Sequence, residues 1–266
     1  MQSHRRRTLL ASLAFALCGA FAANFAVASD SPTSIDQQAI RDAVKLINPT
    51  AEIRAINEFG MPGVKQVLAD TSVVYISDDG RYVFSGLMLD MVEKRNLSDE
   101  AQSLARADIL HTIPKSAVIS FEPKTVKHRI TVFTDVSCHY CQMFHKDLQS
   151  YLDNGIAVDY VPFPRGGEQS PVFGAMQSIW CAADKDKKKV LDGAYAGMMP
   201  TEARCDDPVA AMYNLGDKLG IEGTPAIYDA SGHHLGGYVP ADQMIKQLDT
   251  YAERAKRSNA SVAAAK

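Results

Sequence analysis

Two cysteines separated by two residues, Cys138 and Cys141, stand where a strand-forming run gives way to a helical pattern, and this junction constrains the fold more than any other feature of the sequence. The run Ile130–Thr134 is apolar and β-branched, which predicts a strand. From Cys138 onward, apolar side chains recur at helical spacing through Phe144 and Leu148. The first cysteine is therefore predicted to lie where a helix begins.

A cysteine at a helix N-terminus has unusual chemistry. The unpaired N–H groups and the positive end of the helix dipole stabilise a thiolate and lower the pKa of the thiol. A thiolate attacks disulfides, and a second thiol can resolve the mixed disulfide that forms. Cys138 is the predicted nucleophile and Cys141 the predicted resolving thiol. Between them lie His139 and Tyr140; His139 either raises the local positive potential or is an exposed spectator. His145, one turn further on, is predicted to be a surface residue rather than a base.

A zinc half-site and an inert stabilising disulfide are the alternatives for the motif. Zinc sites normally need a second close pair of ligands, and the other two cysteines, Cys181 and Cys205, are far apart in the sequence. We expect no metal and no cofactor. Joined to each other, these two would close a loop of about 25 residues, which stabilises a fold by about 3.5 kcal/mol in the chain-entropy model. We predict a structural disulfide, beside the apolar Trp180, with a second redox relay as the alternative.

Residues 1–28 have the order of a secretory signal peptide. Arg5–Arg7 is basic, Leu9–Ala23 is apolar and uncharged, and Ala26–Ala28 has the small-x-small form of a cleavage site. A membrane anchor is the alternative. Cys18 would leave with the signal, so four of the five cysteines remain in a mature chain that begins near Ser29, just after Ala28. An even number of cysteines in an exported chain indicates an oxidising compartment.

The charge of the mature chain gives no indication of a nucleic-acid partner. Loss of the signal lowers the 28 basic residues to 25 against 31 acidic ones, a formal net charge of −6. This balance comes without basic clusters or aromatic–arginine runs. No later stretch approaches the roughly 20 apolar residues that a membrane span needs.

Residues 29–88 are predicted to form a small α+β unit. It has too little core to be stable alone, so it needs a partner surface. The predicted elements are a helix from Ser34 to about Ile47, strands at Glu52–Glu58 and Lys65–Leu68, and a hairpin of Val73–Ser77 and Arg81–Ser85 around Asp78-Asp79-Gly80.

Residues 89–115 are predicted to be a linker helix, because Leu89–Leu110 is rich in charged and helix-favouring residues before Pro114 ends the pattern. A helix packed on one domain is the alternative. Residues 116–257 form a second domain, mostly helical between Ser170 and Leu219, and the Ala/Ser-rich tail 258–266 is predicted to be disordered. The further strands predicted in this domain are Val118–Phe121, Ile156–Phe163, Ala226–Asp229 and His234–Tyr238, followed by a helix over Ala241–Lys256.

Thr224-Pro225, immediately before the predicted strand Ala226–Asp229, supplies a second signal. Sequence alone argues for a trans bond, since only about 5–6% of X–Pro bonds are cis. However, a strand, a Cys-x-x-Cys helix and a later Thr-Pro before a strand together resemble the thioredoxin fold. The resemblance implies that Pro225 is cis and lies against the active cysteines, and that Thr224 offers backbone groups to a substrate chain bound by strand addition.

The resemblance is closest to the DsbC family of periplasmic disulfide isomerases. It rests on Thr131–Cys138, Phe163-Pro164-Arg165, Ile179–Ala182 and Gly223–Ala226, with Val74–Gly80 resembling the N-terminal domain of the family. It implies an α+β N-terminal dimerisation domain joined by the linker helix to an α/β thioredoxin-like catalytic domain with a helical insertion. It further implies a periplasmic, V-shaped homodimer whose cleft holds misfolded or mis-disulfide-bonded exported proteins, and a membrane reductase of the DsbD type that keeps it reduced.

Two departures from related proteins bear on the mechanism. Thioredoxin carries a buried acid six residues before its first active cysteine, where this chain has Val132. Proton removal from Cys141 then lacks a dedicated base, which fits an isomerase or an oxidant better than a reductase. His139-Tyr140 also differs from the Gly-Tyr of the family. We predict disulfide isomerisation, with a net oxidant, a DsbG-like thiol-protecting reductase and chaperone, or a holdase as alternatives.

Overall fold

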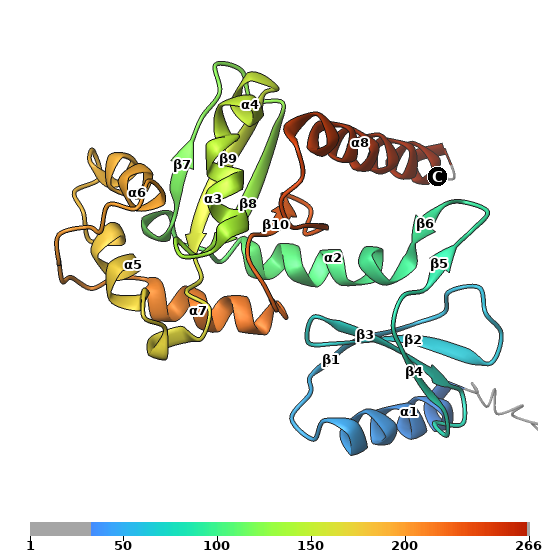
Figure 1. Cartoon of the computed structure of the whole chain (residues 1–266). Coiled ribbons are helices and arrows are strands. Elements are labelled where there is room, and N and C mark those ends of the chain that lie inside the picture. The colour runs from blue at the N-terminus through green and yellow to red at the C-terminus, as the bar shows by residue number, and fades with distance from the viewer. Residues whose placement is uncertain (1–32, 265–266) are drawn as a thin grey trace, which may run out of the picture.

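The computed structural model describes residues 33–264. The predicted signal peptide and its cleavage site lie outside the described residues. Among the helices that are described, none is both long enough and apolar enough to cross a membrane. Figure 1 shows an N-terminal α+β part, a larger C-terminal part built on a central sheet, and a helix that runs between them.

The N-terminal part is a helix packed on an antiparallel meander, as the sequence predicts. Helix α1 presents Ile40, Ala43 and Val44 on one face, and these side chains meet Val67 and Ile76 in a small core. Only glycine fits the predicted turn, because Gly80 has a φ of +71° and a Cβ there would lie 2.6 Å from the Ala39 carbonyl oxygen. The elements are α1 (Thr33–Ile47) and the strands β1 (Ile53–Asn57), β2 (Val64–Ala69), β3 (Ser72–Ser77) and β4 (Val83–Ser85), hydrogen-bonded in that order.

The helix predicted over 89–110 begins later than expected. Residues 89–96 form a β-hairpin of β5 (Leu89–Asp90) and β6 (Arg95–Asn96), and α2 spans Leu97–Leu110. The Asp90 carboxylate accepts hydrogen bonds from the backbone N–H groups of the turn that follows it, and the Asn96 side chain caps α2 by accepting from Asp99 N at 3.0 Å. These two short polar side chains override the helix-favouring composition.

The first turn of α2 contacts both parts of the chain. On the N-terminal side, the Ser98 hydroxyl bonds to Tyr75 Oη at 2.7 Å. On the C-terminal side, the Asp99 carboxylate binds His233 Nδ1 at 2.7 Å and is also paired with Arg106 at 2.7 Å. The helix passes so close to the loop before His233 that a Cβ on Gly232 would lie 2.0 Å from a backbone oxygen of α2.

The C-terminal part is a five-stranded sheet covered by helices on both faces. The strand order is β11-β10-β8-β9-β7, with β8 and β9 parallel and the remaining pairs antiparallel. Alternate side chains of β8 point to opposite faces, so Val132 joins one core cluster and Phe133 the other. The strands are β7 (Ile119–Phe121), β8 (His128–Thr134), β9 (Ile156–Pro162), β10 (Ala226–Asp229) and β11 (His234–Gly236).

The helices of this part confirm the predicted pattern with two corrections. The helical pattern that starts at Cys138 is divided at Asp147 into α3 (His139–Lys146) and α4 (Leu148–Asp153). The predicted helical segment contains α5 (Phe173–Trp180), α6 (Lys187–Tyr195) and α7 (Val209–Lys218). The last helix, α8, runs over Ala241–Ala264, so the predicted disordered tail is helical through residue 264. Alanine is the strongest helix former, and propensity extends the helix beyond its packed turns.

Candidate active site

The fold places Cys138 at the boundary between a strand and a helix. β8 ends at Thr134, and α3 begins at His139 with Cys138 as its N-cap residue, at φ −78° and ψ 123°. The Cys138 carbonyl accepts the first helical bond from Gln142 N at 3.0 Å. Cys138 and Cys141 are 4% and 1% exposed, and both sulfurs are free thiols. The helix start predicted at Cys138 is confirmed.

The surroundings of Cys138 favour its thiolate. A hydrogen bond with the Cys141 thiol is the largest influence and lowers the pKa of Cys138 to about 5, against the opposing effect of burial. The Thr224 hydroxyl and the backbone N–H groups of Cys141 and Tyr140 lower this pKa further, because each donates to the charged form. A thiol with this pKa is almost entirely ionised at pH 7.

The Cys141 thiol is held in the opposite state. Burial is the largest cause and raises the pKa of Cys141, and the hydrogen bond with Cys138 raises it further. The Thr134 side chain acts against these two effects and lowers the pKa of Cys141 in part. At neutral pH the pair therefore consists of one thiolate and one thiol that donates to it.

The Thr224-Pro225 bond is cis. The trans bond expected from general frequencies is therefore wrong, and the cis bond implied by the thioredoxin resemblance is found. Pairing of β10 with β8, with Ala226 opposite Phe133, brings this loop beside the cysteines. The Cys138 thiol donates to the Thr224 carbonyl oxygen at 3.1 Å. The structure thus brings together Cys138, Cys141, Thr224 and Pro225.

The two residues inside the motif face outward. His139 is exposed, Tyr140 is 60% exposed, and their rings meet edge to face at 5.8 Å. Tyr140 therefore presents an aromatic surface next to the Cys138–Cys141 pair.

His145 is not the surface residue that we predicted. Its ring stacks on Tyr195 of α6 with centroids 4.3 Å apart. Its ring nitrogens bond to Tyr160 Oη at 3.0 Å and to the Asp192 carboxylate at 2.9 Å. Burial lowers the pKa of His145, with Asp192 acting against the shift. No local pattern around His145 indicates this contact, because α6 lies in a separate helical segment.

Sequence reasoning also gave no role to a buried carboxylate ahead of the motif, that of Asp135. The Asp135 side chain is 1% exposed and accepts bonds from Ser137 N at 2.7 Å and Ser137 Oγ at 2.6 Å. Its other oxygen accepts from Arg165 N at 2.9 Å and Arg165 Nε at 3.2 Å. Both residues lie in segments on which the family resemblance rests. The carboxylate fixes the loop that carries Cys138 to the end of β9.

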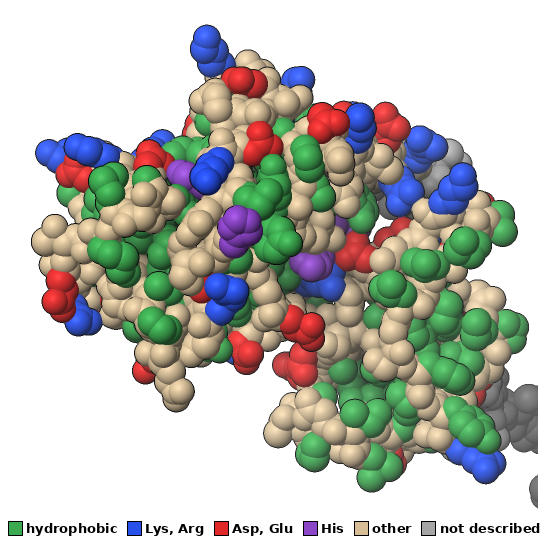
Figure 2. Space-filling view, in the orientation of Figure 1, with side chains coloured by type: hydrophobic (Ala, Val, Ile, Leu, Met, Phe, Trp, Pro, Cys, Tyr) green, Lys and Arg blue, Asp and Glu red, His purple; other side chains and the backbone are tan. Residues whose placement is uncertain are grey.

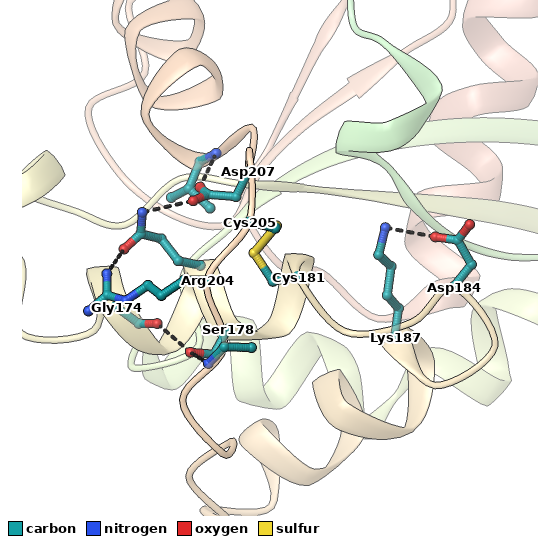
Figure 3. The surroundings of a disulfide bond; sticks show 11 residues. Gly174, Ser178, Cys181, Asp184, Lys187, Arg204, Cys205 and Asp207 are labelled. Atoms are coloured by element: carbon teal, nitrogen blue, oxygen red, sulfur yellow. Dashed lines mark hydrogen bonds and ion pairs between the residues drawn. A yellow bond between two sulfur atoms is a disulfide. The ribbon is translucent and has the colours of Figure 1, made fainter.

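Cys181 and Cys205 form the predicted disulfide, with Cα atoms 5.6 Å apart (Figure 3). Cys181 ends α5, and polar contacts flank the bridge: Arg204 donates to Gln177 at 3.1 Å and Ala203 N donates to Ser178 Oγ at 3.1 Å. Trp180 is buried and donates to the Ala117 carbonyl at 2.9 Å. The disulfide closes the segment that contains α6.

Comparison with known proteins agrees with this arrangement. Residues 115–252 match the model of a thioredoxin-like domain, and residues 28–99 match the N-terminal domain of disulfide bond isomerase proteins. The thiol:disulfide interchange protein DsbC of Salmonella typhimurium is 37% identical over 227 residues, which cover 82% of this chain and 90% of the relative. The chain belongs to the DsbC family.

Two other DsbC proteins are similar to the chain. The thiol:disulfide interchange protein DsbC of Escherichia coli is 38% identical, over 71% of this chain and 78% of the relative. That of Haemophilus influenzae is 34% identical, over 72% and 81%. The matches establish a thiol:disulfide interchange protein with a DsbC-type N-terminal domain and a thioredoxin-like domain.

Proposed function

We propose that this DsbC-family protein isomerises wrong disulfides in exported proteins, with Cys138 as the nucleophile and Cys141 as the resolving thiol. The observation that carries the proposal is the lowered pKa of Cys138, about 5, at a sulfur that lies 3.1 Å from the Thr224 carbonyl. A thiolate of low pKa is also a good leaving group, so Cys138 both attacks a disulfide and is released from it readily.

The reaction proceeds by two exchanges of sulfur–sulfur bonds. The Cys138 thiolate attacks one sulfur of a wrong disulfide, a bond forms between Cys138 and the substrate, and the second substrate sulfur leaves as a thiolate. Another substrate thiolate then attacks the mixed disulfide, forms a new substrate disulfide, and releases the Cys138 thiolate. There is no net change of oxidation state. If no substrate thiolate arrives, Cys141 attacks Cys138 and releases a reduced substrate, which leaves the enzyme oxidised.

Substrate chains would bind along the cis-proline loop. When Cys138 is protonated, its thiol donates to the Thr224 carbonyl, and the Thr224 hydroxyl is a buried group without a hydrogen-bond partner within residues 33–264. Ionisation of Cys138 frees the carbonyl for a substrate N–H and lets the hydroxyl donate to the sulfur. Exposed Tyr140 adds an apolar contact.

We infer a homodimer formed through the N-terminal part. β4 lies at one edge of its sheet, and an unpaired edge is a template for another strand. Figure 2 shows hydrophobic side chains gathered over this part of the molecule. The exposed fractions around β4 are 38% for Val83, 57% for Phe84, 73% for Leu87 and 49% for Leu89. A monomer would leave this apolar patch in water.

The cellular setting follows from the same proposal. The protein would act in the periplasm after removal of residues 1–28, on misfolded or mis-disulfide-bonded proteins, and a membrane reductase of the DsbD type would return the Cys138–Cys141 disulfide to thiols. No cofactor or metal takes part in this exchange.

Reactivation of a scrambled multi-disulfide protein tests the proposal. Cys138→Ala should abolish reactivation, whereas Cys141→Ala should retain shuffling and accumulate mixed disulfides. A Cys138→Ala variant that reactivates at the wild-type rate would exclude the mechanism. If that variant suppresses aggregation but does not reactivate, the chain also has holdase activity. Equilibration with glutathione, with the oxidised fraction read by mass spectrometry, separates the isomerase from a net oxidant or a thiol-protecting reductase.

A further inference from the structure

A chain of two buried hydroxyl groups leads from α6 to the resolving cysteine. Tyr195, the last residue of α6, is 7% exposed, and its hydroxyl is hydrogen-bonded to Thr134 Oγ1. Thr134 is fully buried at the end of β8. The Thr134 side chain lies close enough to the Cys141 sulfur to lower the pKa of that thiol, and Cys141 and Tyr195 belong to the same buried cluster. Tyr195 therefore reaches the active cysteines through one intermediate residue, although α6 is distant in the sequence.

Either hydroxyl of the Tyr195–Thr134 bond could be its donor, and the direction follows from the Cys141 hydrogen, which is directed to Cys138. Tyrosine and threonine hydroxyls carry one hydrogen each and can accept others. Burial raises the pKa of Tyr195 well above its ordinary value, so this hydroxyl keeps its hydrogen throughout the working pH range. When Tyr195 donates to Thr134 Oγ1, the single hydrogen of Thr134 remains available for the sulfur of Cys141.

We propose that Tyr195 is a positioning residue that directs the Thr134 hydroxyl toward Cys141 and thereby accelerates the resolving step. The inference rests on the assignment of Cys141 as the resolving thiol. In thioredoxin a buried acid occupies the position of the apolar, fully buried Val132. The Thr134 hydroxyl would take over part of the role of that acid.

The resolving step is where such a donor is needed. Cys141 must lose its proton before its sulfur attacks Cys138 in the mixed disulfide. A bond then forms between the two enzyme sulfurs, the bond to the substrate breaks, and the departing substrate thiolate takes up a proton that balances the one lost by Cys141. The enzyme pair is oxidised and the substrate is reduced. A hydrogen bond from Thr134 stabilises the Cys141 thiolate during this attack.

The rest of the structure holds Tyr195 in place. The His145 ring of α3 stacks on it at 4.3 Å, and the same histidine is bonded to Asp192, one turn earlier in α6. The Cys181–Cys205 disulfide closes the segment around this helix. The position of the tyrosine ring is thus tied both to the active-site helix and to the disulfide.

Tyr195→Phe removes only the hydroxyl, and Tyr151→Phe is its matched control. Tyr151 is a fully buried tyrosine of the same core whose hydroxyl donates to the Val239 carbonyl rather than toward the cysteines. Rapid-quench measurement with a peptide disulfide, followed by mass spectrometry, gives the rates of mixed-disulfide formation and resolution separately. We expect Tyr195→Phe to slow resolution about tenfold and to move its pH profile upward, with formation nearly unchanged. Tyr151→Phe should leave both rates at wild-type values.

Substitutions of Thr134 test the proposal independently if the Tyr195→Phe variant folds poorly. Thr134→Val should slow resolution at least as much as Tyr195→Phe, and Thr134→Ser, which keeps the hydroxyl, should restore it. Equal resolution rates and pH profiles in wild type, Tyr195→Phe and Thr134→Val would overturn the proposal. If the wild type itself formed no mixed disulfide through Cys138, the proposed function would fail instead, so the two failures are distinguishable.

Discussion

The buried carboxylate of Asp135 should stabilise the protein mainly through backbone hydrogen bonds rather than through its ion pair. Asp135→Ala leaves two backbone N–H groups, those of Ser137 and Arg165, without their acceptor. A buried donor left unpaired costs about 1–3 kcal/mol, so the variant, with two such donors, should lose about 2–6 kcal/mol of unfolding free energy. The Arg165 side chain is 49% exposed, and such pairs contribute about 0–1 kcal/mol. Arg165→Ala should therefore cost about 1 kcal/mol or less.

Urea unfolding of the reduced protein, with both single variants and the double variant, measures these costs and their coupling. Asp135→Asn is the matched control, because it keeps one oxygen as an acceptor and should lose less stability than Asp135→Ala. Asp135→Ala should also raise the pKa of Cys138, since the loop that carries this cysteine is no longer fixed by the carboxylate. The reasoning would be refuted if Arg165→Ala destabilised the protein as much as Asp135→Ala. It would also be refuted if the coupling free energy between Asp135 and Arg165, from the double variant, accounted for most of the stability lost in Asp135→Ala.

Three further predictions concern Cys138, His233 and the exposed edge strand β4. Cys141→Ala removes the largest stabilising hydrogen bond of the Cys138 thiolate, so the pH midpoint of Cys138 alkylation in this variant should lie above the value of about 5 expected in the wild type. Equal midpoints in the two proteins would contradict the assigned cause. Burial lowers the pKa of His233, but the hydrogen bond to Asp99 outweighs burial and the pKa is raised. The stability that protonated His233 contributes is therefore complete below about pH 6.5, and it is lost as the pH rises through the pKa of His233 in the folded protein. The melting temperatures of wild type and His233→Gln should converge at alkaline pH, and a constant difference would exclude this linkage. Phe84→Glu on the exposed β4 should yield a monomer in light scattering that retains thiol exchange and loses isomerisation. The control Val126→Glu, at a half-exposed position of the C-terminal part, should remain dimeric. A dimeric Phe84→Glu variant would place the interface elsewhere.

Local patterns in the sequence predicted most of the elements because each pattern was complete within a few residues. The β-branched runs that became β8 and β10, and the Asp-Asp-Gly turn, carry their own signals. The position of Cys138 at a helix start followed in the same way. The β5–β6 hairpin was missed because its determinants, Asp90 and Asn96, are isolated polar side chains within a helix-favouring composition.

The contacts around the active cysteines depend on tertiary packing, and the sequence could not supply them. His145 has a polar neighbourhood in the sequence, yet in the fold it lies between α3 and α6. Asp135 and Arg165 are 30 residues apart in the chain and meet only because β8 and β9 run parallel and end together. The cis geometry of Pro225 came from family resemblance alone, since nothing in Thr224-Pro225 itself distinguishes cis from trans.

The first turn of α2 has a consequence for how the molecule could be divided. The Leu97 carbonyl accepts from Gln66 at 3.3 Å, Ser98 bonds to Tyr75, and Asp99 bonds to His233. These three consecutive residues therefore contact both halves of the molecule. A single peptide-bond cut at this turn would leave two cores, each of which keeps its own sheet, and the halves would then be held together only by noncovalent contacts such as the hydrogen bond from Thr71 Oγ1 to the Lys218 carbonyl at 2.8 Å.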